Sequence, residues 1–184
     1  MKILAFAASL KKNSVNAMLI KIVSKILKEQ DCDIELIDFS EFDVPIYNGD
    51  IEESKGIPSG ALKLKEKIEK CDGIVISSPE YNYSVPGTLK NLIDWTSRIR
   101  PQPFKDRNIL VMSASPAMAG GVRGLWHLRV PLEGLGAFVY PEMFSLAVAH
   151  EAFDSQGNLK DKNLVNTLEN NIKSFLKHIK NECK

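Results

Sequence analysis

The sequence lacks a strong excess of charge of either sign. Of its 184 residues, 24 are lysine or arginine and 23 are aspartate or glutamate, which gives a net charge of +1. Domains that bind nucleic acids are usually strongly basic, so this balance indicates that no nucleic acid is a partner. It also gives no support to an acidic electron carrier.

Long apolar runs, cysteine pairs and histidine clusters are also missing. No apolar run approaches the ~20 residues that a membrane-spanning helix needs, so we expect no membrane insertion. The three cysteines (Cys32, Cys71 and Cys183) are widely spaced and form no CxxC pair, which is typical of the reducing cytoplasm. Only three histidines occur, none at metal-ligand spacing, and we therefore expect no metal site.

The sequence does contain a regular alternation of short apolar runs and amphipathic stretches. The apolar runs predict strands at 2–8, 33–38, 73–78, 107–113 and within 137–148. The amphipathic stretches predict helices at 14–30, 58–71, 87–99, 123–136 and 161–181. Pro131 is expected to kink or break the fourth helix. Residues 39–57 are expected to form a long irregular loop, and loops of that length are often functional.

The order of these elements predicts an α/β fold. Strands that are apolar throughout are buried on both faces, as in a parallel sheet covered by helices. Five such strands favour a flavodoxin-like three-layer sandwich whose parallel sheet has the order 2-1-3-4-5. No linker, repeat or low-complexity tract divides the chain, so residues 1–184 are expected to form a single domain.

The loop after the first strand is the first candidate binding segment, because ligands of such folds bind beyond the carboxyl ends of the strands. Residues 9–16 lead into a helix, whose free N–H groups and partial positive charge attract phosphate. The loop contains neither GxxxxGKS/T nor GxGxxG, which excludes a nucleoside triphosphate loop and a dinucleotide fingerprint. Phosphate binding and a plain N-cap at Asn13 or Ser14 both stay open at this point.

Two further loops follow the third and fourth predicted strands. Residues 78–87 combine two tyrosines, two prolines and an asparagine, a composition that suits a rigid loop facing a flat ring, or a surface turn packed on a neighbour. Residues 113–121 are mostly small, which lets a ligand approach the backbone closely but also fits a flexible connection. The three loops are expected to meet at one edge of the sheet.

These loops resemble those of the NADPH-dependent FMN reductase family, which includes bacterial quinone, chromate and azo-dye reductases. The first loop of the family reads roughly GSxRxxSxN, and residues 8–16 read ASLKKNSVN. The second reads PEYNxSxPGxLKNxxDW, and residues 79–95 read PEYNYSVPGTLKNLIDW. The third combines a serine, a glycine pair and a basic residue, here Ser115, Gly120, Gly121 and Arg123. The similarity extends across most of the chain.

The resemblance implies an FMN-dependent oxidoreductase, an NAD(P)H:acceptor reductase. It implies FMN as the cofactor and NADPH or NADH as the electron donor. The implied partner is a small-molecule electron acceptor, namely a quinone, an azo or nitro compound, chromate or free flavin. Because one open flavin face would receive both donor and acceptor, we expect a ping-pong mechanism. The resembling family is oligomeric, so we expect a homodimer or homotetramer.

The resemblance also implies the site residues. The predicted phosphate-binding residues are Ser9, Lys11, Ser14 and Asn16. The residues predicted to line the isoalloxazine ring are Pro79, Glu80, Tyr81 and Asn82, and Ser115 is predicted to close the other side. The flavin performs the redox chemistry, so no catalytic side chain is assigned. Glu80 resembles a general base, but local hydrogen bonding is its expected role.

Two positions depart from the family pattern, and one group stays open. Ala8 replaces the usual glycine, and Lys11 replaces the usual arginine, which exchanges a bidentate fork for a point charge. Neither change removes the site, although both are expected to loosen FMN binding. A basic and aromatic group follows the glycine pair and suits a nicotinamide-cofactor phosphate, an anionic acceptor, a subunit interface or an exposed helix face: Arg123, Trp126, His127 and Arg129.

Two other functions are compatible with the same fold. A flavodoxin-type one-electron carrier would share the fold and FMN, but it would resemble a TxTGxT phosphate loop and tend to be strongly acidic. A receiver-type signalling module would need an acidic pair after the first strand and an aspartate at the end of the third. The sequence has Ala7-Ala8-Ser9 and Ser77-Ser78 at those places, which argues against the receiver module.

Overall fold

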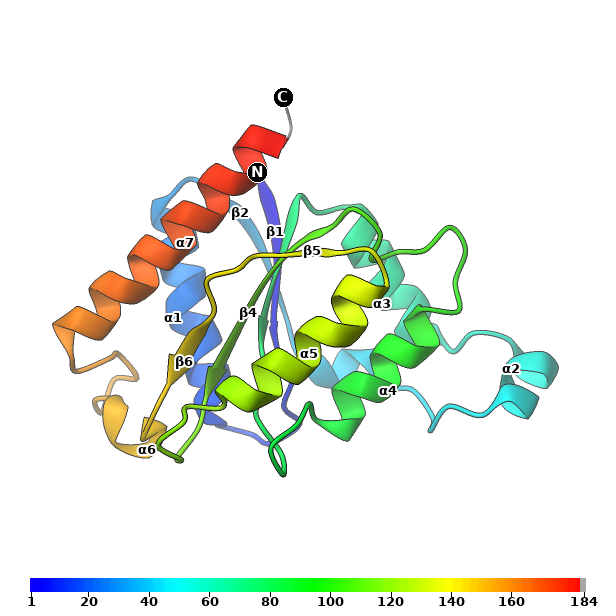
Figure 1. Cartoon of the computed structure of the whole chain (residues 1–184), viewed down its shortest axis with the longest axis horizontal. Helices are drawn as coiled ribbons and strands as arrows, with labels where there is room; N and C mark the ends of the chain where they lie inside the picture. Colours follow the sequence, from blue (N-terminus) through cyan, green and yellow to red (C-terminus); the bar gives the residue numbers. More distant parts are fainter. Residues whose placement is uncertain (183–184) are drawn as a thin grey trace.

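A single parallel sheet forms the centre of the protein, seen in a computed structural model that describes residues 1–182 (Figure 1). Cys183 lies outside the described residues. The sheet follows the predicted order, with strands β2 (Asp33–Ile37), β1 (Lys2–Ala7), β3 (Gly73–Ser77), β4 (Asn108–Ala114) and β5 (Phe138–Val139). The flavodoxin-like order predicted from the sequence is confirmed.

The last predicted strand is interrupted, so the sheet has six strands where five were predicted. Beside β5, a separate strand β6 (Phe144–Leu146) also pairs in parallel with β4. Residues 140–143 lie between the two strands and include Pro141. Proline has no N–H to donate to a strand ladder, which accounts for the break.

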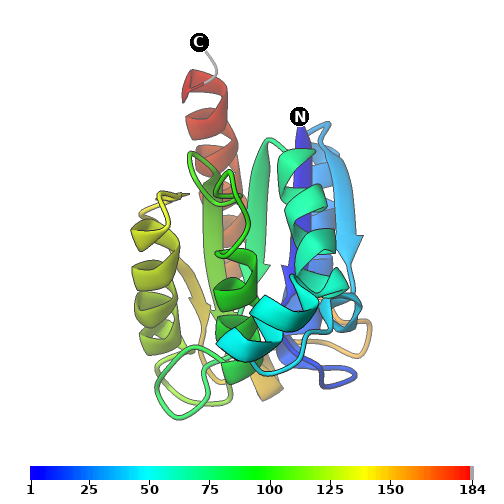
Figure 2. The same ribbon diagram turned by 90° about the vertical axis from the view of Figure 1, so that its right-hand side faces the viewer.

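Helices cover both faces of the sheet and complete the predicted three layers (Figures 1 and 2). One core cluster joins strand residues to α1 (Val15–Glu29) and α7 (Lys162–Glu182). The other joins the opposite strand faces to the remaining large helices, which are α3 (Ser59–Glu69), α4 (Gly87–Thr96) and α5 (Val122–Gly134). Consecutive β1 residues alternate between the two clusters, as the pleat of a strand requires.

Three short helical segments were missed by the sequence prediction. The expected irregular loop at 39–57 contains a 3-10 helix, η1 (Phe39–Phe42), and α2 (Gly49–Lys55), while α6 (Ala149–Ala152) follows β6. Pro131 was expected to kink or break this helix, and the break does not occur, because α5 continues through this residue to Gly134; the kink stays a prediction.

Two polar side chains of α4 hold the segment that leads from η1 to α2. Trp95 is fully buried, and its indole Nε1 donates to the carbonyl oxygen of Pro45 at 2.7 Å. The Asn91 amide donates to the same carbonyl at 2.9 Å and accepts from the N–H of Tyr47 at 2.9 Å. The segment is therefore fixed against α4 by its backbone. Within residues 1–182, we find no helix with the length and apolar character needed to cross a membrane.

Gly60→Ala should destabilise the protein, because the added methyl group would overlap the backbone carbonyl of Asp43, where α3 packs on η1. Overpacking of this kind costs about 1–3 kcal/mol. Gly134→Ala is the matched control: it is also a helical glycine, but no heavy atom lies within 4 Å of the added carbon. The control should gain roughly 0.5–1 kcal/mol. Urea unfolding measures both, and equal stabilities would contradict the close packing at Gly60.

Candidate functional site

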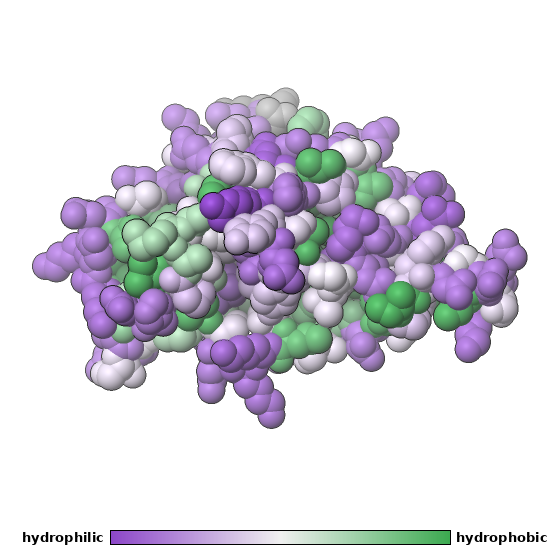
Figure 3. Space-filling view, turned by 60° about the horizontal axis from the view of Figure 1, so that its bottom comes forward, coloured by the Kyte–Doolittle hydropathy of each residue, from purple (hydrophilic) through white to green (hydrophobic). Residues whose placement is uncertain are grey.

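The three candidate loops leave the sheet at the same edge, at the bottom of Figure 1. Backbone hydrogen bonds tie each loop to a neighbouring strand end: Ala8 N–H donates to Ser77, Ser78 N–H to Met112 and Ser115 N–H to Leu146, at 2.8–3.0 Å. Figure 3 brings this edge of the molecule forward and shows polar and apolar residues intermixed over it. The structure therefore brings the three sequence-predicted loops together.

Asn16 connects these loops through its side chain. It lies in the first turn of α1, is only 2% exposed, and donates from Nδ2 to the carbonyl oxygen of Ala114 at 2.8 Å. Its Oδ1 accepts from the Ala114 N–H at 2.9 Å and from the Ser77 hydroxyl at 3.0 Å. The amide thus bonds to the ends of β3 and β4, and it is not exposed at the surface of the loop.

The loop before α1 presents donors without partners. Ser14 is the N-cap, and its hydroxyl oxygen accepts from the Ala17 N–H at 3.0 Å. In the described part of the chain, the backbone N–H groups of Leu10, Lys12 and Asn13 have no acceptor. Ser9 is half-buried and Lys11 is exposed. Together with the positive end of the helix, this donor set is suited to an anion.

The loop after β3 is a tight turn. The backbones of Tyr81 and Ser84 exchange two hydrogen bonds of 3.1 Å, and the two residues between them have positive φ, 48° at Asn82 and 66° at Tyr83. This is the pattern of a type I′ turn. The N–H groups of Asn82 and Tyr83 have no acceptor among residues 1–182, and both tyrosines are exposed. Pro79, before the turn, is buried.

Glu80 joins this loop to α5. Its Oε2 accepts from the Gly124 N–H at 2.8 Å, in the first turn of that helix, and its Oε1 lies 3.7 Å from the Arg123 guanidinium. The helix has no side-chain cap at Gly121, so the Glu80 carboxylate takes that place. A carboxylate at this end is also favoured by the helix dipole.

The loop after β4 is closed by glycines. Gly121 has φ of 89°, and a Cβ there would overlap the buried Ser113 hydroxyl. Gly120 has φ of 62°, and a Cβ there would lie only 3.0 Å from the backbone of residues 145–147. Ser115 is half-buried, and its hydroxyl oxygen accepts from the Ala117 N–H at 3.2 Å. The glycine pair therefore lets α5 begin directly against the end of β4.

The basic and aromatic residues of α5 contact two different parts of the structure. Arg123 lies over the Tyr83 ring, 5.2 Å from its centroid, and His127 Nδ1 is 3.0 Å from the Ser84 hydroxyl, so both support the turn. Arg129 points elsewhere and donates to the carbonyl oxygens of Val139 and Tyr140, beside β5. Trp126 is 55% exposed.

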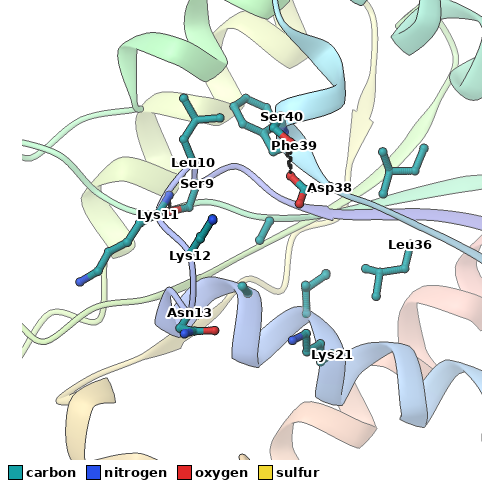
Figure 4. Close-up of a pocket in the computed structure, with 14 residues that line it drawn as sticks. Ser9, Leu10, Lys11, Lys12, Asn13, Lys21, Leu36, Asp38, Phe39 and Ser40 are labelled. Carbon is teal, nitrogen blue, oxygen red and sulfur yellow. Dashed lines mark hydrogen bonds between the residues drawn. The ribbon is translucent and has the colours of Figure 1, made fainter.

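Two cavities lie beside the first loop, on the side of β2. The larger, about 570 Å³, is bounded by the first loop, α1 and the end of β2 (Figure 4). The smaller, about 400 Å³, extends toward the N-terminus of α4. Both cavities are lined by Leu10, Phe39 and Ser40, and residues 79–82 and Ser115 line neither. Sequence reasoning missed this region, where an acidic residue at the end of the second strand, Asp38, was the available signal.

Comparison with known proteins identifies the family. The model of the NADPH-dependent FMN reductase family matches residues 1–151. The quinone reductase of Escherichia coli K12 is 33% identical over 177 residues, which cover 95% of this chain and 93% of the relative. An NAD(P)H-dependent FMN reductase of Pseudomonas aeruginosa is 35% identical over 162 residues, which cover 87% and 85% of the two chains.

A solved structure agrees over nearly the full length. The flavoenzyme NAD(P)H:(acceptor) oxidoreductase FerB of Paracoccus denitrificans superposes with a TM-score of 0.81 at 28% identity, and 98% of this chain and 97% of that chain are covered. The chain therefore belongs to the NADPH-dependent FMN reductase family.

Proposed function

We propose that this chain, as one domain over residues 1–184, transfers electrons from NAD(P)H through FMN to quinones, azo or nitro compounds, chromate or free flavin. Membership of the family supports the general activity, that of an NAD(P)H-dependent FMN or quinone reductase. The observation that carries the proposal is the Asn16 amide, which gathers the ends of β3 and β4 beside the N-terminus of α1. A loop suited to an anion therefore lies next to two loops suited to a ring, which supports the proposal.

The first loop fits the phosphate of FMN. Ser9, Lys11 and Ser14 supply two hydroxyls and a cation, and three free backbone N–H groups complete the set. The Ser14 hydroxyl still has a proton to donate while it caps the helix. Asn16 was grouped with these donors from the sequence. Because its amide is committed to the strand ends, we propose that it positions the loop and does not contact the phosphate.

The second and third loops fit the isoalloxazine ring. We propose that residues 79–82 line the ring, that the free N–H of Asn82 or Tyr83 donates toward its N5, and that Ser115 closes the opposite side. When bound, FMN supplies the two-electron chemistry between NAD(P)H and the acceptor. The role of the protein is to fix the ring against rigid backbone, which the Glu80 cap on α5 and the type I′ turn both provide.

The thiols of the described residues give no competing redox chemistry. Cys32 and Cys71 are free, which agrees with the cytoplasmic location that we propose. Burial raises the pKa of the Cys71 thiol to about 11 and also raises that of Cys32. Both thiols therefore stay protonated near neutral pH and are poor nucleophiles.

The surface around the turn favours assembly of several copies. Tyr81, Tyr83 and Trp126 are exposed aromatic side chains at or near the proposed flavin-binding loop. Aromatic residues and arginine are enriched in protein interfaces, and Arg123 stacks on Tyr83 in this region. We propose a homodimer or homotetramer in which a partner covers this surface.

Ser9→Ala and Asn16→Ala should have different effects. Ser9→Ala removes a phosphate contact and should weaken FMN binding by about tenfold to a hundredfold. Stability without FMN should change by less than about 0.5 kcal/mol, because Ser9 is not part of the core. Asn16→Ala instead leaves the buried N–H and C=O of Ala114 unpaired, which should cost about 1–3 kcal/mol.

Flavin titration and urea unfolding of the apoprotein measure these two effects separately. Unchanged FMN affinity in Ser9→Ala would reject the phosphate assignment. An Asn16→Ala apoprotein as stable as the wild type would reject the structural role of the amide.

Glu80→Gln should retain most of the rate of hydride transfer, because the glutamine carbonyl still accepts from the Gly124 N–H. Glu80→Ala removes the cap and should cost about 1 kcal/mol of stability. Stopped-flow reduction of the FMN-loaded variants by NADPH is the measurement. A loss of about 100-fold in Glu80→Gln with FMN still bound would give Glu80 a proton-transfer role.

The steady-state kinetics should be ping-pong. If the nicotinamide and the acceptor use the same open face of the ring, the oxidised donor must leave before the acceptor enters. Double-reciprocal plots of NADPH oxidation at several quinone concentrations should then give parallel lines. Intersecting lines would demonstrate a ternary complex and reject the shared face.

A further inference from the structure

The larger cavity lies on the β2 side of the proposed phosphate loop and shares residues 9–13 with it, but residues 79–82 and Ser115, proposed to hold the flavin ring, do not line it. Its walls come from three elements: residues 9–13, α1, and the end of β2 with the start of η1. At about 570 Å³ it has the size of a small-molecule site. Figure 4 shows the side chains of the first loop and α1 on one side of it and those of β2 and η1 on the other.

One side of this cavity is cationic. Three lysines line it, Lys11 and Lys12 from the loop and Lys21 from α1, although the end of the Lys11 side chain points away from it in Figure 4. None of these three lysines forms an ion pair with a carboxylate within the described residues 1–182. Two unpaired ammonium groups at one opening create a local positive potential that suits phosphate groups.

The opposite side carries a carboxylate. Asp38 directly follows β2 and is the N-cap of η1, and its Oδ1 accepts from the Ser40 N–H at 2.9 Å and from the Ser40 hydroxyl at 2.7 Å. These hydrogen bonds lower the pKa of Asp38, so the group is ionised at neutral pH. Its Oδ2 has no hydrogen-bond partner in the described part of the chain. An acidic residue at the end of the second strand of an α/β sheet is well placed to accept from ribose hydroxyls.

The floor between these charged sides is apolar. Ile20 from α1, Leu36 from β2 and Phe39 from η1 all line the cavity. Leu36 is 43% exposed, which is high for a leucine within a strand. An apolar surface of this kind can receive a flat heterocyclic base. The cavity thus offers a counterpart to each of the three parts of a nucleotide: base, ribose and phosphate.

The second cavity extends this site toward the flavin loops. It shares Leu10, Phe39 and Ser40 with the first cavity and reaches Gly87 and Thr88, in the first turn of α4. Adjacent strands lie about 4.8 Å apart, so the ends of β2 and β4 are separated by roughly 15 Å. An extended dinucleotide can span that distance.

We propose that the larger cavity binds the adenosine diphosphate half of NAD(P)H. The inference rests on the proposed function, because it supplies the donor site of the same reaction. Lys12 and Lys21 attract the diphosphate, Asp38 binds the ribose hydroxyls, and the apolar floor receives the adenine. The nicotinamide half then runs past Leu10 toward the loop at residues 79–84. The assignment explains how the chain binds a dinucleotide without a GxGxxG loop.

Calorimetric titration of the FMN-loaded protein with ADP and with 2′,5′-ADP tests the site without turnover. Lys21→Glu should weaken binding of both fragments by at least about fivefold, since it reverses one exposed charge contact. The KM for NAD(P)H should rise by a similar factor at unchanged kcat, because the contact binds the donor equally in the ground and transition states. Lys28→Glu is the matched control: Lys28 is also exposed on α1 but does not line the cavity. It should leave fragment binding and KM unchanged.

Three outcomes would overturn the proposal: no fragment binding to the wild type, equal effects of Lys21→Glu and Lys28→Glu, or displacement of the fragments by an aromatic carboxylate such as cinnamate. The last result would make the cavity an acceptor site. Failure of the proposed function is distinguishable, since it would appear as wild-type protein that does not oxidise NAD(P)H with any acceptor while ADP still titrates into the cavity.

Discussion

The buried amide of Asn16 is the interaction on which the whole site depends. A parallel sheet brings the carboxyl ends of its strands to one edge, but it does not set how the following loops lie relative to one another. An amide both donates and accepts, so this one side chain satisfies the N–H and C=O of Ala114 and also accepts from Ser77. Each of these buried groups would cost about 1–3 kcal/mol if left unpaired, so α1 is held in one position. Its free N-terminal donors therefore face the edge where the other two loops emerge.

A second connection makes the loops after β3 and β4 one unit. Glu80 reaches from the first of these loops to the N-terminus of α5, and Gly124 favours this close approach, since a Cβ there would lie 3.1 Å from that of Glu80. Arg123 and His127 then contact the turn from the same helix. A turn with two non-glycine residues at positive φ is strained on its own. Here Arg123 and His127 of α5, together with Glu80 directly before the turn, restrain it, which is the condition under which such strain persists.

The sequence was sufficient to predict the strand order and the three loops, because apolar runs and strand ends are local features. It missed η1, α2 and α6, none of which exceeds seven residues, since so short a segment shows no helical periodicity. The polar caps Asp38 and Asn48 were the only local signals of the first two. The role of Asn16 was beyond sequence reasoning for a different reason. Its partner Ala114 lies 98 residues away, and nothing in the loop itself distinguishes a phosphate donor from a side chain that bonds to a distant strand.

The motif at residues 79–95 specifies more than the loop after β3. Its first half forms the turn, whereas Asn91 and Trp95 in its second half fix the backbone of residues 45–47, and that segment supplies Ile46 to the wall of the second cavity. The larger cavity has no such motif, because its lining comes from three separate stretches of chain. The composition does not reveal its positive charge either. The net charge of +1 is a sum over the whole chain, in which acidic residues elsewhere offset the unpaired Lys12 and Lys21. A binding site whose residues come from separate stretches of the chain can be recognised only when the fold brings those stretches side by side.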